Sequence, residues 1–198
     1  MAKQLHIMQR AYSAITDNTG SSGGLFGLSF ANPGAVTAVS FTLVGNSIGQ
    51  VVCKNNPGIG VTDIGFTGSF FSTDATPTSS NDDVIATIDI DQNICCGGPR
   101  VVGFVEQNGT VLSWQVLGTV ALKSINTLFL QWDQPHHQFI FQLNNDGQVF
   151  ETYTVSDTSA PFYPYESLFI GRVVADCTST PRPYSAVDAD FRDVYVNQ

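Results

Sequence analysis

The sequence is poor in charge, and most of the charge that it has is negative. Asp, Glu, Lys and Arg make up 13% of the 198 residues, about half of the share that is typical of globular domains. Eight basic residues stand against 17 acidic ones, which gives a net charge of −9 and a pI near 4.4. Because such a surface repels phosphate groups, we expect no binding to nucleic acid.

Long apolar runs and several common functional motifs are also missing. No apolar stretch reaches the roughly 18 residues that a membrane span needs, so no membrane span is expected. Residues 1–4 lack the apolar core of a signal peptide in this numbering. The sequence has no glycine-rich nucleotide loop, no His-Glu-x-x-His and no Cys-x-x-Cys, so nucleotide and zinc-enzyme chemistry lack support.

What the sequence does contain is two-residue alternation of apolar and polar side chains, which indicates half-buried strands. Val84, Ala86, Ile88 and Ile90 share one face, for example. Asn108-Gly109 between two such runs is a strong hairpin signal. Strands are predicted over residues 37–43, 64–71, 84–91, 101–106, 111–120, 127–132, 138–143, 148–155, 167–174 and 186–196.

Many short strands without a sustained helical period predict an all-β fold, an antiparallel β-sandwich with little helix. We expect residues 25–198 to form a single sandwich domain. Residues 1–24 are expected to be an N-terminal arm or edge strand of the same unit, although residues 4–15 also fit a short helix.

Residues 128–133 and 138–143 (LFLQWD and QFIFQL) resemble a hairpin, and residues 187–197 resemble the closing strand, of the concanavalin A-like jelly rolls. That superfamily includes laminin-G modules, legume lectins and glucanases. Residues 64–71, 117–120 and 153–158 resemble uncharacterised bacterial exported proteins with this fold. The resemblance implies a jelly-roll fold, and it leaves the activity open because the fold carries lectins, glucanases and structural domains.

Glucanases of this superfamily carry two Glu in an E-x-D-x-E strand, as nucleophile and general acid. The only three Glu here, Glu106, Glu151 and Glu166, are far apart in the sequence. Asp89-Ile90-Asp91 has the spacing of such a pair, but we interpret it as a solvated strand face. His6 and the turn pair His136-His137 form no evident triad. We therefore expect a protein that is not an enzyme.

Glycan binding requires exposed aromatic rings that stack on sugars. The predicted ligand-binding residues are Trp114, Phe162, Tyr163, Tyr165 and Tyr184. Residues 161–165 hold three aromatic residues and two prolines, so this loop either packs over a sandwich edge or forms a contact surface. We expect Trp132 to lie in the core.

Calcium is the one cofactor that the sequence suggests, because it binds carboxylate and carbonyl oxygens. The resemblance adds that lectins of this fold often hold calcium in rim loops. Asp82 and Asp83 are the predicted ligands. The alternative is that these carboxylates belong to an acidic surface with no metal.

Cys53, Cys95, Cys96 and Cys177 form an even set without metal-binding spacing. Adjacent cysteines rarely bond to each other, so we expect Cys95 and Cys96 to bridge to Cys53 and Cys177, in either pairing. Such disulfides predict an extracytoplasmic location. Four reduced, buried thiols are the alternative.

Two hypotheses about function come from these observations. The first is a non-catalytic recognition module that binds a glycan or a surface protein through rim loops. The second is a structural subunit of a surface layer, appendage or particle that associates with its own copies, for which low charge and open strand edges are suitable. A glycoside hydrolase is the third possibility.

Overall fold

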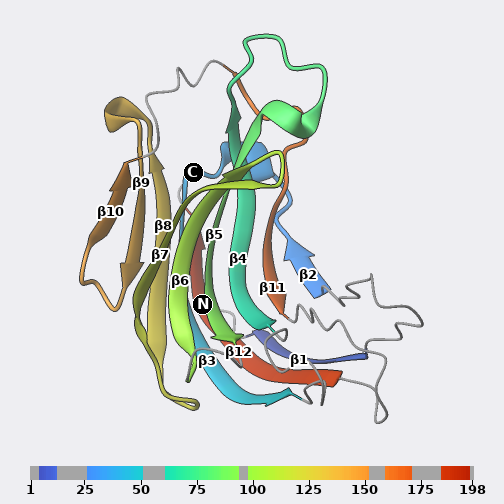
Figure 1. The fold of residues 1–198 in the computed structure, drawn as a ribbon, viewed down its shortest axis with the longest axis vertical. Coiled ribbons are helices and arrows are strands. Elements are labelled where there is room, and N and C mark those ends of the chain that lie inside the picture. The colour runs from blue at the N-terminus through green and yellow to red at the C-terminus, as the bar shows by residue number, and fades with distance from the viewer. Residues whose placement is uncertain are drawn as a thin grey trace.

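The computed structural model describes residues 5–12, 26–50, 61–93, 98–151, 159–170 and 184–196, which form two antiparallel sheets (Figure 1). Sheet A has the order β1 (Leu5–Tyr12), β12 (Tyr184–Val196), β3 (Ala38–Gln50), β8 (Asn126–Asp133), β9 (Gln138–Leu143) and β10 (Gln148–Glu151). Sheet B has the order β2 (Phe26–Ser29), β11 (Glu166–Ile170), β4 (Val61–Ser72), β5 (Asp83–Asn93), β6 (Arg100–Gln107) and β7 (Thr110–Thr119). Helices of the described part are single 3-10 turns: η1 (Pro33–Ala35), η2 (Ser80–Asp82) and η3 (Gln134–His136).

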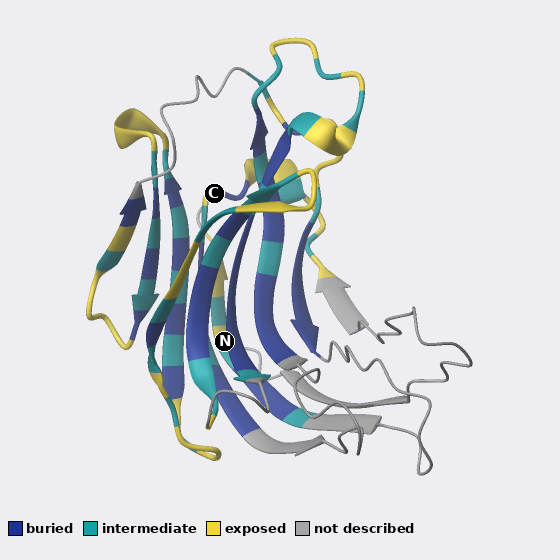
Figure 2. Cartoon of the chain, in the orientation of Figure 1, coloured by how far each residue is buried: buried dark blue, intermediate teal, exposed yellow. Residues whose placement is uncertain are grey.

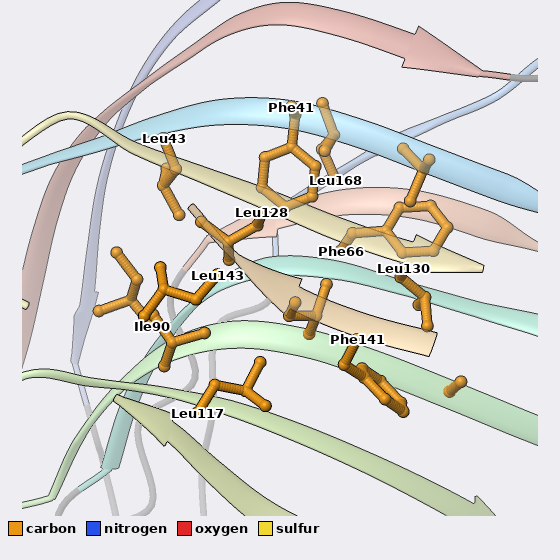
Figure 3. Packing of buried hydrophobic residues seen from close by; sticks show 14 of the residues in the cluster. Phe41, Leu43, Phe66, Ile90, Leu117, Leu128, Leu130, Phe141, Leu143 and Leu168 are labelled. Atoms are coloured by element: carbon orange, nitrogen blue, oxygen red, sulfur yellow. The ribbon is translucent and has the colours of Figure 1, made fainter. Parts of the chain in front are cut away.

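The predicted antiparallel sandwich is confirmed, and alternation explains how it forms. One side of each sheet is apolar, and the two apolar sides face each other across a shared core (Figure 3). The largest side chains with less than 2% exposure include five phenylalanines from both sheets: Phe41, Phe66, Phe139, Phe141 and Phe191. Trp132 is 5% exposed and lies within this core, where its ring centroid is 4.5 Å from that of Phe71.

Close contact between the sheets depends on a glycine in β6. A Cβ atom added to Gly103 would lie 2.7 Å from the ring of Phe141, which belongs to β9 of the opposite sheet. No real Cβ contact is that short, so the missing side chain makes room for the aromatic ring. Interior packing is so dense that even one added methyl group lowers the stability of the folded state.

The opposite side of sheet B is polar and directed away from the core. Figure 2 shows β5, β6, β11 and most of β4 as largely buried where burial is described, whereas β7 at the edge of the sheet is mostly intermediate or exposed. We call this side the outer face of sheet B, and it carries the side chains that alternate with the core residues of β4, β5, β6 and β11. It is the part of the fold that positions the candidate site.

Candidate functional site

A single cross-strand row crosses the outer face of sheet B. Thr67 of β4 is opposite Thr87 of β5, which is opposite Phe104 of β6, which is opposite Trp114 of β7. The Thr87 hydroxyl is hydrogen-bonded to that of Thr67 at 2.8 Å. Three strand spacings of about 4.8 Å separate the two ends of the row, so it combines hydroxyl groups at one end with aromatic rings at the other.

Trp114 is the exposed end of this row, and an arginine packs on its ring. The Trp114 side chain is 50% exposed, and the Arg100 guanidinium carbon lies 5.2 Å from the ring centroid. Nε and one terminal nitrogen of Arg100 donate to the Asp91 Oδ2 atom at 3.2 and 3.0 Å. Asp91 therefore fixes the plane of the guanidinium, and the guanidinium supports the indole ring.

Carboxylates gather on the same face next to this pair. Asp91 and Asp89 alternate with the core residue Ile90, and Asp63 of β4 is the direct cross-strand partner of Asp91. The three aspartates are only 4–9% exposed. The face thus places acidic side chains and one arginine beside an exposed aromatic ring.

The loop over residues 161–165 is attached to this face by two anchoring side chains. The two carboxylate oxygens of Asp83 accept the backbone N–H groups of Phe162 and Tyr163 at 2.8 and 2.9 Å. The Ser69 hydroxyl donates to the Tyr163 carbonyl at 2.8 Å and accepts the Tyr165 N–H at 3.0 Å. These contacts hold Phe162 and Tyr163 at 51% and 65% exposure.

Tyr165 connects the loop to the row. Its hydroxyl is hydrogen-bonded to the Thr67 side chain, which is the hydroxyl end of the row. Burial raises the pKa of the Tyr165 phenol, and the nearby charges of Glu106 and Asp83 act in the same direction, whereas the Thr67 hydrogen bond opposes them. Tyr165 is therefore a neutral phenol at physiological pH.

The structure brings together some of the predicted binding residues and separates others. Trp114 and Tyr165 lie at opposite ends of one row, and Phe162 and Tyr163 are exposed on the attached loop. Tyr184 is the first residue of β12 in sheet A, opposite Tyr12. Sequence reasoning missed Thr67, Thr87 and Phe104, which only the strand register aligns with Trp114. It also missed Arg100, which is opposite Thr119 and whose side chain reaches the Trp114 ring.

The structure gives the predicted calcium ligands another role without testing the metal itself. Asp83 is 2% exposed and anchors the aromatic loop, and the Asp82 carbonyl accepts the Thr73 N–H. No cluster of three His, Cys, Asp or Glu side chains suited to a metal occurs in the described ranges. The calcium site remains a prediction, and the four cysteines lie outside the described residues.

Glu166 is one of the three glutamates that form no glucanase-like pair in the sequence, and the structure places it inside the sandwich. It is fully buried at the start of β11, on the core side and opposite Gly68 of β4. Neither carboxyl oxygen has a hydrogen-bond partner among the described residues. Burial raises the pKa of Glu166 to about 9, so the side chain is neutral at physiological pH.

No protein-family model and no curated protein matches the chain. Solved structures with a similar fold include a β-glucanase of Bacillus licheniformis, with a TM-score of 0.46 and 10% identity over 83% of this chain and 67% of that one. A β-1,3-glucanase of Mycobacterium marinum gives 0.42 and 12% over 82% and 64%, and a galectin of Caenorhabditis elegans gives 0.38 and 9% over 96% of each chain. The chain spans about two thirds of the length of both glucanases.

The described strands form the antiparallel sandwich that the sequence motifs suggested. The expectation that the protein is not an enzyme does not stand, because several structures of similar fold are named glucanases or glycosidic hydrolases. Within the described residues, no helix has the length and hydropathy of a membrane span.

Proposed function

We propose that this protein recognises a glycan on the outer face of sheet B. The observation that carries the proposal is the exposed Trp114 ring, which Arg100 and Asp91 hold at the aromatic end of the cross-strand row, three strands away from its hydroxyl end. A sugar has an apolar C–H face that stacks on an aromatic ring, and its hydroxyls bond to carboxylates, hydroxyls and guanidinium groups. Sites of this kind combine an apolar platform with a few well-placed polar groups.

A broad glycan array followed by calorimetric titration tests the proposal. We expect Trp114→Ala to weaken binding of the best glycan by about tenfold or more, which corresponds to 1.4 kcal/mol. Tyr195→Ala is the matched control, because Tyr195 is an aromatic residue of 62% exposure on the outer face of sheet A. Absence of binding to every glycan, or an equal loss in both variants, would contradict glycan recognition on this face.

A second candidate function, glycoside hydrolysis, is favoured by the pairing of Asp63 with Asp91. Directly opposed residues of an antiparallel pair have Cβ atoms about 4.5–5.5 Å apart, and retaining glycosidases hold their two carboxyl groups about 5–5.5 Å apart. We expect a hydrolase to act on soluble glucans or galactans and to lose that activity in Asp91→Asn. If an excess of the wild-type protein binds these glycans without releasing reducing ends, hydrolysis is contradicted and only glycan recognition is supported.

The location of this activity outside the cytoplasm is part of the proposal, and the cysteine set supports it. Alkylation followed by non-reducing mass spectrometry of the secreted and of the cytoplasmically expressed chain checks the point. Two intact disulfides are expected in the secreted form. Four alkylated thiols in both forms would contradict this part of the proposal.

A further inference from the structure

The β7 edge of sheet B differs from the rest of the chain in charge. Residues 107–122, between Glu106 and Lys123, contain no charged side chain, and they include all of β7. In the described part of the chain, β7 pairs with β6 and with no other strand. One side of its backbone is therefore available to another strand.

Exposed apolar side chains are concentrated along the same edge. Nine large hydrophobic residues of the described ranges are exposed, and five of them belong to β7, to the connection that follows it, or to the neighbouring strand β10. The five are Val111, Trp114, Leu122, Ile125 and Val149. The side chains of Gln115 and Gln148 are hydrogen-bonded at 3.2 Å, which ties the edge of sheet B to β10, the edge of sheet A.

Natural proteins usually protect an open strand edge with lysines, prolines or bulges. β7 has no lysine and no proline. It does have two bulges, at the register shifts beside Val101 and Val105 of β6. Residues 113–116 between the bulges remain regular, so they are the segment that can accept a partner strand.

We propose that β7 pairs antiparallel with β7 of a second copy of this chain, in the register that places Gln115 opposite Gln115 of that copy, so that the two B sheets join into one continuous sheet. Charge favours a second copy at this edge in particular. Two chains of net charge −9 repel each other, and an uncharged edge lets them meet without opposing carboxylates. A two-fold axis across the pair would bring the exposed apolar side chains of both copies together.

Sedimentation velocity of the full chain, from low micromolar to the highest soluble concentration, tests the inference. We expect the mass to rise from one copy to two. Gln115→Lys should raise the dimer dissociation constant by about tenfold or more, since it places like charges across the new strand pair. Gln142→Lys, in β9 of sheet A, is the matched control with the same new net charge of −8 and should change the constant by less than about twofold.

Circular dichroism and thermal denaturation of both variants establish that they are folded. A wild-type protein that stays monomeric at every concentration would overturn the inference. Equal effects of Gln115→Lys and Gln142→Lys would overturn it as well, because they would indicate a general effect of charge. If a strictly monomeric protein still binds a glycan, the dimer inference fails and the proposed function stands. A failure of the inference can therefore be told apart from a failure of the proposed function.

Discussion

Glu166 is a neutral carboxylic acid inside a hydrocarbon core. Its partner position across the strands is Gly68, and a Cβ atom there would lie 2.5 Å from the Glu166 Cγ. The glycine that thins the core side of β4 therefore makes room for a glutamate of β11. A buried polar group without a partner costs free energy, and here the cost depends on whether the group carries a proton.

We predict that Glu166 makes the folded state less stable as pH rises. The pKa is 4.5 in the unfolded chain and about 9 in the folded one, so the unfolded state loses its proton first. Stability is greatest below about pH 4.5 and declines towards about pH 9, by up to about 1.4 kcal/mol per pH unit. Urea denaturation across this range measures the decline.

Glu166→Gln should remove this part of the pH dependence, because the amide does not ionise. Asp193→Asn is the control: Asp193 is exposed and has a φ of 49°, which asparagine tolerates. The same slope in wild type and Glu166→Gln would show that another group causes the dependence.

The aromatic loop over residues 161–165 is anchored by the buried Asp83 carboxylate together with the Ser69 hydroxyl. We predict that Asp83→Ala lowers the free energy of unfolding by about 2 kcal/mol, because it removes the acceptor of two backbone N–H groups. Asp83→Asn keeps one carbonyl acceptor and should lose less. Chemical denaturation measures both, and equal losses would contradict an anchoring role.

The predicted calcium site gives a separate expectation for Asp82 and Asp83. If Asp82 and Asp83 bind calcium, the metal should raise the melting temperature of the wild type, and Asp82→Asn should abolish that rise. Differential scanning calorimetry with calcium and with a chelator measures it. Identical melting curves in both conditions would contradict the metal site.

We expect the packing between the two sheets to be sensitive to substitution of Gly103. Gly103→Ala should cost about 1–3 kcal/mol, because the new methyl group meets the Phe141 ring. Phe141→Ala removes the Cγ and Cδ1 atoms that the new methyl group would meet at 2.8 and 2.7 Å, so the double variant should be more stable than the two single losses predict. Additive losses in denaturation experiments would show that the two residues are not coupled.

Most strands could be predicted from the sequence, because alternation is a local signal. β2 was missed, since four residues such as FGLS carry too little pattern. Trp114 and Tyr165 were predicted one by one, but their alignment with Thr67, Thr87 and Phe104 depends on the register of four strands. Glu166 was missed as a core residue because β11 has every residue buried, including this polar one.

The charge of the whole molecule sets how its copies interact. With a net charge of −9, two chains repel each other through water, and salt screens this repulsion over about 8–10 Å at physiological strength. We predict that added sodium chloride lowers the dissociation constant of the β7-mediated dimer. Sedimentation at increasing salt measures the change, and weaker association at higher salt would indicate an ionic interface instead.

The order of strands in the two sheets also has a consequence for biosynthesis. β12 lies between β1 and β3, and β11 lies between β2 and β4, so segments from opposite regions of the sequence must be inserted as neighbours. A nascent chain on the ribosome therefore exposes apolar strands that lack their pairing partners until residues 166–196 have emerged. Such late closure slows folding and calls for holding chaperones during translation.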